Sequence, residues 1–198
     1  MTTSNDGHNT DNVIDLFTGK LYSQRRYHRI IRLAPEMDGL EMVYSNQTHP
    51  DKFFSLKILC WALKADGDVV GMVPWLNKLV ACPDIQDPLN GMWEGYYDPG
   101  IDDIFFDAPV HKVVELESAA EYYEMECDDD QEIVQEIPDN IGTHAVLSND
   151  GFRSLLLKEV ISWRLLADGT VSGTLVDESK VVETPVLPGD PCLYPADI

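Results

Sequence analysis

The sequence predicts a mainly β protein of the α+β class, built as a tandem duplication of a small antiparallel β-meander or barrel-like module. We expect a pseudo-two-fold axis to relate the copies and an acidic insertion to separate them. Three observations predict this fold: an internal repeat at offsets of 102 and 103 residues, an Asp-Gly turn in each repeat, and a run of acidic and aromatic residues between the repeats.

The repeat is clearest where the stretch starting at Cys60 aligns, without gaps, with the stretch starting at Ser162. Identical pairs at the offset of 102 are Trp61/Trp163, Leu63/Leu165, Ala65/Ala167, Asp66/Asp168, Gly67/Gly169, Val69/Val171, Gly71/Gly173, Lys78/Lys180, Val80/Val182 and Pro83/Pro185. At the offset of 103 the pairs are Ile30/Ile133, Pro35/Pro138, Gly39/Gly142, Val43/Val146, Ser45/Ser148 and Asn46/Asn149. Convergence on Asp-Gly turn chemistry explains the central block alone, whereas the collinear outer matches favour duplication.

The elements of each copy follow from turn chemistry and alternation. Asp-Gly favours a tight hairpin turn, so we expect paired strands at about 56–65 and 68–75, and again at about 158–167 and 170–176. A short strand, LVAC or VVET, then closes each meander, and VYSN or VLSN ends an earlier strand. Whether YHRIIRLA, within residues 22–34, is a strand or a helix stays open, because its apolar spacing suits a helix and its β-branched content suits a strand.

The segment between the copies is acidic and rich in aromatic residues. Residues 84–140 contain 18 acidic side chains, and Lys112 is their only Lys or Arg. We expect KVVELES to form a strand and SAAEYYEMEC a helical turn or two. The predicted organisation is therefore a flexible tail (1–20), module copy 1 (21–90), the acidic insertion (91–127) and module copy 2 (128–198).

Composition excludes two classes of partner. The chain of 198 residues has a formal net charge of −21 and a pI of about 4.3, so nucleic-acid phosphates and anionic lipid surfaces repel it. We therefore expect neither direct nucleic-acid binding nor membrane binding. The polar N-terminus lacks an export signal and the four cysteines are sparse, which predicts a cytoplasmic protein with reduced thiols.

No motif of known chemistry is present. The sequence has no GxSxG elbow, Walker loop, GxGxxG after a strand or HExxH, and its five histidines are dispersed. The acidic residues near Asp98 do not have the spacing of a calcium-binding loop. We therefore expect no catalytic residues, no cofactor and no metal.

These observations predict a non-enzymatic interaction protein that binds a basic protein partner through the acidic, aromatic insertion. The candidate partner-binding residues are Trp93, Tyr96, Tyr97, Asp98, Asp102, Asp103, Phe105, Phe106 and Asp107. One alternative is a nucleic-acid mimic that inhibits a DNA-binding protein, which needs carboxylates along an elongated face. A second alternative is an enzyme that uses carboxylates as acid and base.

A charge reversal between the copies predicts an assembly contact. Three basic residues of copy 1 align with three acidic residues of copy 2, namely Arg25, Arg26 and Arg29 with Asp128, Asp129 and Glu132. Unlike copies should attract each other, either inside one chain or across a homodimer, and the sequence leaves both arrangements open.

Overall fold

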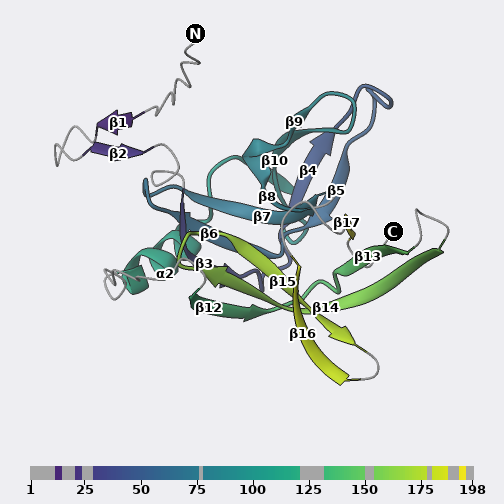
Figure 1. Cartoon of the computed structure of the whole chain (residues 1–198). Coiled ribbons are helices and arrows are strands. Elements are labelled where there is room, and N and C mark those ends of the chain that lie inside the picture. Colours follow the sequence, from purple (N-terminus) through teal and green to yellow (C-terminus); the bar gives the residue numbers. More distant parts are fainter. Residues whose placement is uncertain are drawn as a thin grey trace, which may run out of the picture.

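A computed structural model describes residues 12–14, 21–23, 29–75, 78–120, 132–149, 154–177, 180–186 and 192–194 (Figure 1). Its strands are β1 (Asn12–Ile14), β2 (Leu21–Ser23), β3 (Ile30–Pro35), β4 (Glu41–Ser45), β5 (Phe54–Lys57), β6 (Cys60–Lys64), β7 (Val69–Trp75), β8 (Lys78–Ala81), β9 (Gln86–Asp87), β10 (Gly91–Asp98), β11 (Asp103–Phe105), β12 (Ile133–Pro138), β13 (His144–Asn149), β14 (Ser154–Leu166), β15 (Val171–Asp177), β16 (Lys180–Val186) and β17 (Cys192–Tyr194). The helices of this part of the chain are a short 3-10 helix, η1 (Cys82–Asp84), and an α-helix, α2 (Val110–Ala120).

The fold is mostly β and its strands pair antiparallel, as predicted. In the first half the strand orders are β3-β6-β7-β8 and β11-β10-β4-β5, with β9 beside β10. In the second half the order is β16-β15-β14-β13-β17, with β12 also paired to β14. Within the described ranges, no helix has the length and apolar content needed to cross a membrane.

Both Asp-Gly turns form hairpins. Gly67 and Gly169 have φ values of 93° and 87°, the left-handed region that glycine adopts without steric cost. In the first turn the N–H of Gly67 donates to the carbonyl of Lys64 (3.0 Å), and in the second the N–H of Gly169 donates to that of Leu166 (2.9 Å). Local turn chemistry therefore determines these two hairpins.

The structure decides the element left open at residues 22–34 and corrects the one predicted at KVVELES. The segment at Ile30–Pro35 is a strand, because its backbone pairs with β6 and this long-range pairing overrides the helical spacing of its apolar residues. The predicted strand KVVELES is wrong, since these residues lie in helix α2. The helix begins after Pro109, whose carbonyl accepts the N–H groups of Lys112 and Val113, and it buries Leu116 completely.

Strand register repeats between the two halves. β3 pairs with β6 so that Ala34 lies opposite Trp61, and β12 pairs with β14 so that Ile137 lies opposite Trp163. Both ladders shift register after their first residue, between Ile30 and Arg32 in one and between Ile133 and Gln135 in the other. The next ladders also correspond, because the same two tryptophans lie opposite Gly71 and Gly173.

Buried hydrophobic residues form two clusters. The inner cluster joins the two halves and contains Leu33, Leu59, Cys60, Ala62, Val70, Met72, Ala81, Ile137, Ala145, Val160, Trp163, Leu165, Val171 and Leu175. The outer cluster joins the sheet of β3, β6, β7 and β8 to β4, β10 and α2 and contains Ala34, Leu40, Met42, Ile58, Trp61, Leu63, Val73, Cys82, Ile85, Tyr96 and Leu116. The sheet of β3, β6, β7 and β8 thus contributes side chains to both clusters.

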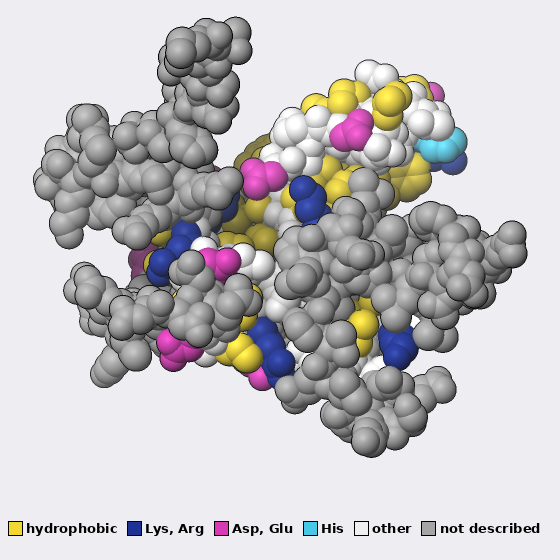
Figure 2. All heavy atoms as spheres, in the orientation of Figure 1, with side chains coloured by type: hydrophobic (Ala, Val, Ile, Leu, Met, Phe, Trp, Pro, Cys, Tyr) yellow, Lys and Arg dark blue, Asp and Glu magenta, His cyan; other side chains and the backbone are white. Residues whose placement is uncertain are grey.

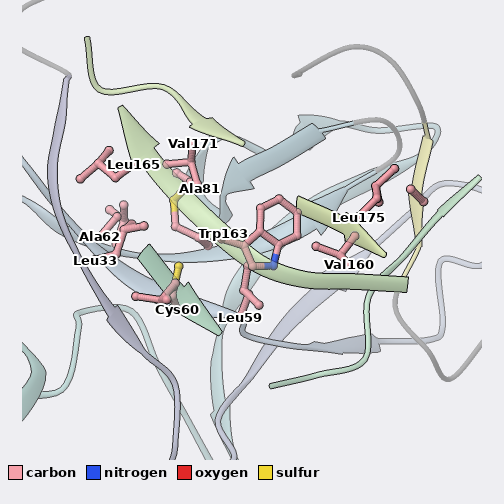
Figure 3. Packing of buried hydrophobic residues seen from close by; sticks show 14 residues of the cluster. Leu33, Leu59, Cys60, Ala62, Ala81, Val160, Trp163, Leu165, Val171 and Leu175 are labelled. Carbon is pink, nitrogen blue, oxygen red and sulfur yellow. The ribbon is translucent and has the colours of Figure 1, made fainter. Parts of the chain in front are cut away.

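The two halves meet through faces that do not correspond. Trp163 lies in the inner cluster with Leu59 and Cys60 of the first half (Figure 3), whereas its counterpart Trp61 lies in the outer cluster. A two-fold axis would bring corresponding faces together. The packing therefore does not confirm the predicted pseudo-two-fold arrangement.

The central strands of the two halves differ in composition. β6 and β7 are buried on both faces, and their sequences CWALK and VVGMVPW are almost entirely apolar. In the second half the strands alternate apolar residues with Ser162, Arg164, Ser172 and Thr174. Of these, Ser172 and Thr174 are also buried, at 2% and 0% exposure.

The open edge of β3 is bonded by a side chain of the other half. The amide of Gln135, on β12, accepts the N–H of Leu33 (2.8 Å) and donates to the carbonyl of Leu33 (2.7 Å). The glutamine side chain thus takes the place of a neighbouring strand at this point. It satisfies both the N–H and the carbonyl of Leu33.

Candidate functional site

The segment predicted as an insertion completes the sheet of the first half. β10 pairs with β4, so that Tyr96 lies opposite Met42, and β10 also pairs with β11, so that Tyr97 lies opposite Ile104. A tight turn joins β10 to β11. In it the N–H of Asp102 donates to the carbonyl of Asp98 (2.9 Å), and the N–H of Gly100 donates to the side chain of Asp98 (2.8 Å).

The candidate partner-binding residues differ in exposure. Asp102, Asp103, Phe106 and Asp107 are exposed. The half-buried members of the set are Trp93, Tyr97, Asp98 and Phe105. The four exposed residues all belong to the β10–β11 turn, to β11 or to the short connection that follows it.

Tyr96 was wrongly included among the candidate partner-binding residues. It is 1% exposed and cannot touch a partner. Its ring packs against Trp61 at 4.8 Å, and its hydroxyl accepts the N–H of Gly71 at 2.9 Å. Burial raises the pKa of this hydroxyl strongly. Tyr96 is therefore a core residue that anchors β10 over the outer cluster.

Two exposed aliphatic residues escaped the sequence analysis. Ile101 is 69% exposed and Ile104 is 45% exposed, while Phe106 nearby is 65% exposed. We call Ile101, Asp102, Asp103, Ile104, Phe106 and Asp107 the hairpin surface. The one signal that could have identified the aliphatic pair is the turn sequence DPGIDD, which places Ile101 at a hairpin tip.

All charged side chains of the hairpin surface are acidic. The hydroxyl of Tyr97 donates to the carboxylate of Asp102 at 2.9 Å, and this hydrogen bond is the main reason that the pKa of Tyr97 is raised. The charges of Asp102, Glu41 and Asp98 raise that pKa further. Lys112 offsets little of this charge at the surface, because its side chain is 5% exposed.

Lys112 belongs to a cluster at the start of α2. Its Nζ lies 3.2 Å from Oδ2 of Asp38, and Nε2 of His111 lies 2.8 Å from the same oxygen. The hydrogen bond with His111 is the largest cause of a lowered pKa for Asp38, and Lys112 lowers it further. The buried ammonium is thus neutralised within the fold.

A cleft of about 250 Å³ opens beside this cluster. Its lining combines two carboxylates, a histidine and three apolar residues: Asp38, Leu40, Asp98, Phe105, Pro109 and His111. The cleft therefore lies where the loop after β3, the β10–β11 hairpin and the N-terminus of α2 meet. In the part of the chain that the structure describes, no group of three or more His, Cys, Asp or Glu side chains is arranged to hold a metal ion.

A largely half-buried aromatic cluster is formed by residues of β4, β5 and β7. The ring of Tyr44 stacks on Phe54 at 5.4 Å and meets Trp75 edge-on at 5.0 Å, and Phe53 beside them is 68% exposed. Figure 2 shows hydrophobic side chains gathered over this part of the surface, with a histidine at its edge. The sequence did not identify this cluster, in which Trp75 of β7 joins Tyr44, Phe53 and Phe54 from another sheet.

Most of the predicted assembly residues, namely Arg25, Arg26, Asp128 and Asp129, lie outside the described residues. The two that are described occupy corresponding places, because the carbonyl of Arg29 accepts the N–H of Ala65 and that of Glu132 accepts the N–H of Ala167. Arg29 also lies against Gly169, in the turn of the second half.

Comparison of the chain with known protein families, with curated proteins and with solved structures found no match.

Proposed function

We propose that this is a non-enzymatic interaction protein that binds a basic protein partner through the hairpin surface. The observation that carries the proposal is the placement of three exposed apolar side chains, Ile101, Ile104 and Phe106, directly beside exposed carboxylates. The single base of residues 84–140 is buried and paired with Asp38.

The arrangement suits a protein partner on physical grounds. Apolar side chains at the centre of an interface supply affinity by leaving water, and like charges around them steer a partner of opposite charge. A nucleic-acid mimic instead needs carboxylates spread along an elongated face at roughly phosphate intervals. Apolar residues lying among Asp102, Asp103 and Asp107 favour the compact docking site over the mimic.

We also propose that the two halves descend from one duplicated module. The matching registers of the β3–β6 and β12–β14 ladders support this proposal, as does the shared shift at their start. A further similarity is that Trp61 donates its indole N–H to Glu36 and Trp163 donates its own to Asp139. If so, the β10–β11 hairpin is an elaboration of one copy, which is where a new binding function is expected.

A capture experiment with purified variants tests the docking site. The chain is immobilised and incubated with lysate of its native host at low salt, and captured proteins are identified by mass and then purified. We expect a basic protein that binds wild type at low salt, dissociates at high salt, and loses at least about tenfold in affinity to Asp103→Lys with Asp107→Lys. The double substitution Ile101→Ser with Phe106→Ser should weaken binding without changing its salt dependence.

The matched control is Asp51→Lys with Glu159→Lys, which makes the same change in net charge at exposed positions away from the hairpin. Equal losses in both charge variants would show attraction by overall charge and overturn the docking site. A captured DNA-binding protein that duplex DNA displaces would favour the mimic instead.

Location and assembly stay predictions from the sequence. We propose a cytoplasmic protein that forms a homodimer through the charge runs of the two copies. Light scattering at low ionic strength tests this: reversing Arg25, Arg26 and Arg29 to Glu should reduce the dimer, and adding Asp128→Lys and Asp129→Lys should restore part of it. An unchanged mass after the triple reversal would show that the charge runs are solvated faces.

A further inference from the structure

We propose that the cleft beside the hairpin surface receives the side chain of one Lys or Arg residue of the partner. This inference rests on the proposed function and specifies the chemistry that the partner must present. It follows from the shape of the cleft, from the carboxylate oxygens in it and from its apolar walls.

The size of the cleft suits one side chain. Its volume of about 250 Å³ is below the range of about 300–1,000 Å³ that is typical of pockets for drug-sized molecules. The cleft lies on the face of the hairpin that Asp98 and Phe105 share with Asp103, whereas Ile104 points to the opposite face with Tyr97. Because β11 is an edge strand, a partner that contacts Asp103 around this edge can extend a side chain into the cleft.

Two carboxylates line the cleft, each with one oxygen that has no protein partner within the described ranges. His111 and Lys112 both bond to Oδ2 of Asp38, which leaves Oδ1. Gly100 donates to Oδ1 of Asp98, which leaves Oδ2. Carboxylate oxygens are the acceptors that an ammonium or guanidinium group requires, and hydrogen bonds to ionised groups are about twice as strong as neutral ones.

The remaining walls suit the stem of a long basic side chain. Leu40, Phe105 and Pro109 present apolar surface to the cleft. Lys and Arg bury their methylene stems against such surface while the charged end reaches a polar group. A small inorganic cation would gain nothing from these walls, so the lining favours an alkyl cation.

Fixed charge behind the cleft holds Asp38 in place. Lys112, at 5% exposure, cannot turn away from Oδ2 without leaving its charge unpaired in the protein interior. The carboxyl group of Asp38 is thus oriented before a ligand arrives. This reduces the conformational entropy that its side chain loses on binding.

A titration followed by NMR tests the cleft without the partner. The probes are N-acetyl-lysine methylamide and N-acetyl-arginine methylamide, and the uncharged control is N-acetyl-norleucine methylamide. We expect saturable shifts at the Leu40 methyls and the His111 ring with the two basic probes, and none with norleucine. A second series of titrations uses cadaverine, a free diamine. Comparing its affinity with that of the peptide probes shows whether the natural ligand is a protein side chain or a small amine.

The matched variants are Asp98→Asn, inside the cleft, and Asp51→Asn, on the exposed loop after β4. Asn at position 98 retains the oxygen that accepts the N–H of Gly100 and removes the charge. We expect about a tenfold loss of affinity for both basic probes in Asp98→Asn, equivalent to about 1.4 kcal/mol, and no loss in Asp51→Asn. A melting temperature equal to that of wild type shows that each variant is folded.

The inference would be overturned by no saturable shift with either basic probe, by an equal response to norleucine, or by full binding in Asp98→Asn. Tighter binding of cadaverine than of both peptide probes would assign the cleft to a small amine and also overturn it. The capture experiment uses Asp103, Asp107, Ile101 and Phe106, none of which lines the cleft. Loss of capture with an intact probe response thus contradicts the proposed function, whereas the reverse contradicts this inference alone.

Discussion

Trp61 and Trp163 occupy corresponding places in the two halves, yet they are buried against different neighbours. Each lies opposite a glycine of the next strand and donates its indole N–H to a carboxyl side chain on the loop after β3 or β12. Trp61 packs against Tyr96 of β10, whereas Trp163 belongs to the cluster that contains Cys60. One local arrangement thus supports two different long-range contacts.

The first prediction concerns Glu36, which is 5% exposed and accepts the indole N–H of Trp61 and the backbone N–H groups of Asp38 and Leu40. Glu36→Ala leaves these donors without an acceptor, so we expect the free energy of unfolding to fall by about 2–4 kcal/mol. Glu36→Gln retains one acceptor oxygen and should cost less. Urea unfolding followed by tryptophan fluorescence measures both, with the exposed Glu117→Ala as a control. A Glu36→Ala variant as stable as wild type would contradict the role of this side chain.

The second prediction uses the two Asp-Gly turns as a matched pair. Alanine at either glycine carries the cost of a left-handed backbone, about 1–2 kcal/mol. At Gly67 the new Cβ meets no atom within 4 Å, but at Gly169 it would lie 3.0 Å from the backbone nitrogen of Ile30 and closer still to Cγ of Arg29. Gly169→Ala should therefore lower the melting temperature more than Gly67→Ala. Equal shifts would show that this turn does not pack on the start of β3.

The third prediction is a pH dependence that originates at Asp38. Its pKa in the folded chain is lowered, mainly by the hydrogen bond with His111 and then by Lys112. A lowered pKa means that the stabilisation is present above the unfolded-state value of about 3.9 and is lost as pH falls through the folded value. We expect Asp38→Asn to cost about 1–2 kcal/mol at pH 7, less than a fully buried pair because Asp38 is half exposed.

The measurement is urea unfolding of wild type and Asp38→Asn between pH 7 and pH 3. The difference in the free energy of unfolding should begin to shrink below about pH 4, where Asp38 becomes protonated in the unfolded chain, and should shrink further as pH falls through the lowered pKa of the folded chain. A difference that stays constant over this range would show that the charge of Asp38 does not stabilise the fold. Lys112→Met is the companion variant, and in its background Asp38→Asn should cost less, because one of the two cations that lower the pKa of Asp38 is gone.

The fourth prediction concerns Gln135, which holds the edge of β3. Gln135→Ala removes both hydrogen bonds to Leu33 and leaves the backbone groups of a partly buried edge without partners. We expect a loss of about 1–3 kcal/mol in the free energy of unfolding. Gln86→Ala removes a local bond from an exposed glutamine to Pro83 and should cost much less. Hydrogen exchange at Leu33 should also accelerate in the Gln135 variant, and unchanged exchange there would contradict the bridge.

The sequence by itself determined the strands and turns that depend on neighbouring residues. Asp66-Gly67 and Asp168-Gly169 favour hairpins through their own backbone preferences, so the strands on either side could be predicted from alternation. Helix α2 was misread because Val113 and Val114 are β-branched, and the burial of Leu116 that stabilises the helix involves distant residues. The charge and aromatic content of the hairpin segment could likewise be predicted, since composition needs no fold.

Only the tertiary structure decided which of the aromatic residues of the hairpin segment are buried. Tyr96 and Tyr97 are adjacent in one strand, so their side chains point to opposite faces of the sheet. Alternation alone predicts that one of them is buried but does not say which, and the contact between Tyr96 and Trp61 decides it. The cleft at Asp38 and Asp98 is a tertiary feature for the same reason: residues 60 positions apart meet there only because β10 and α2 pack on the first half.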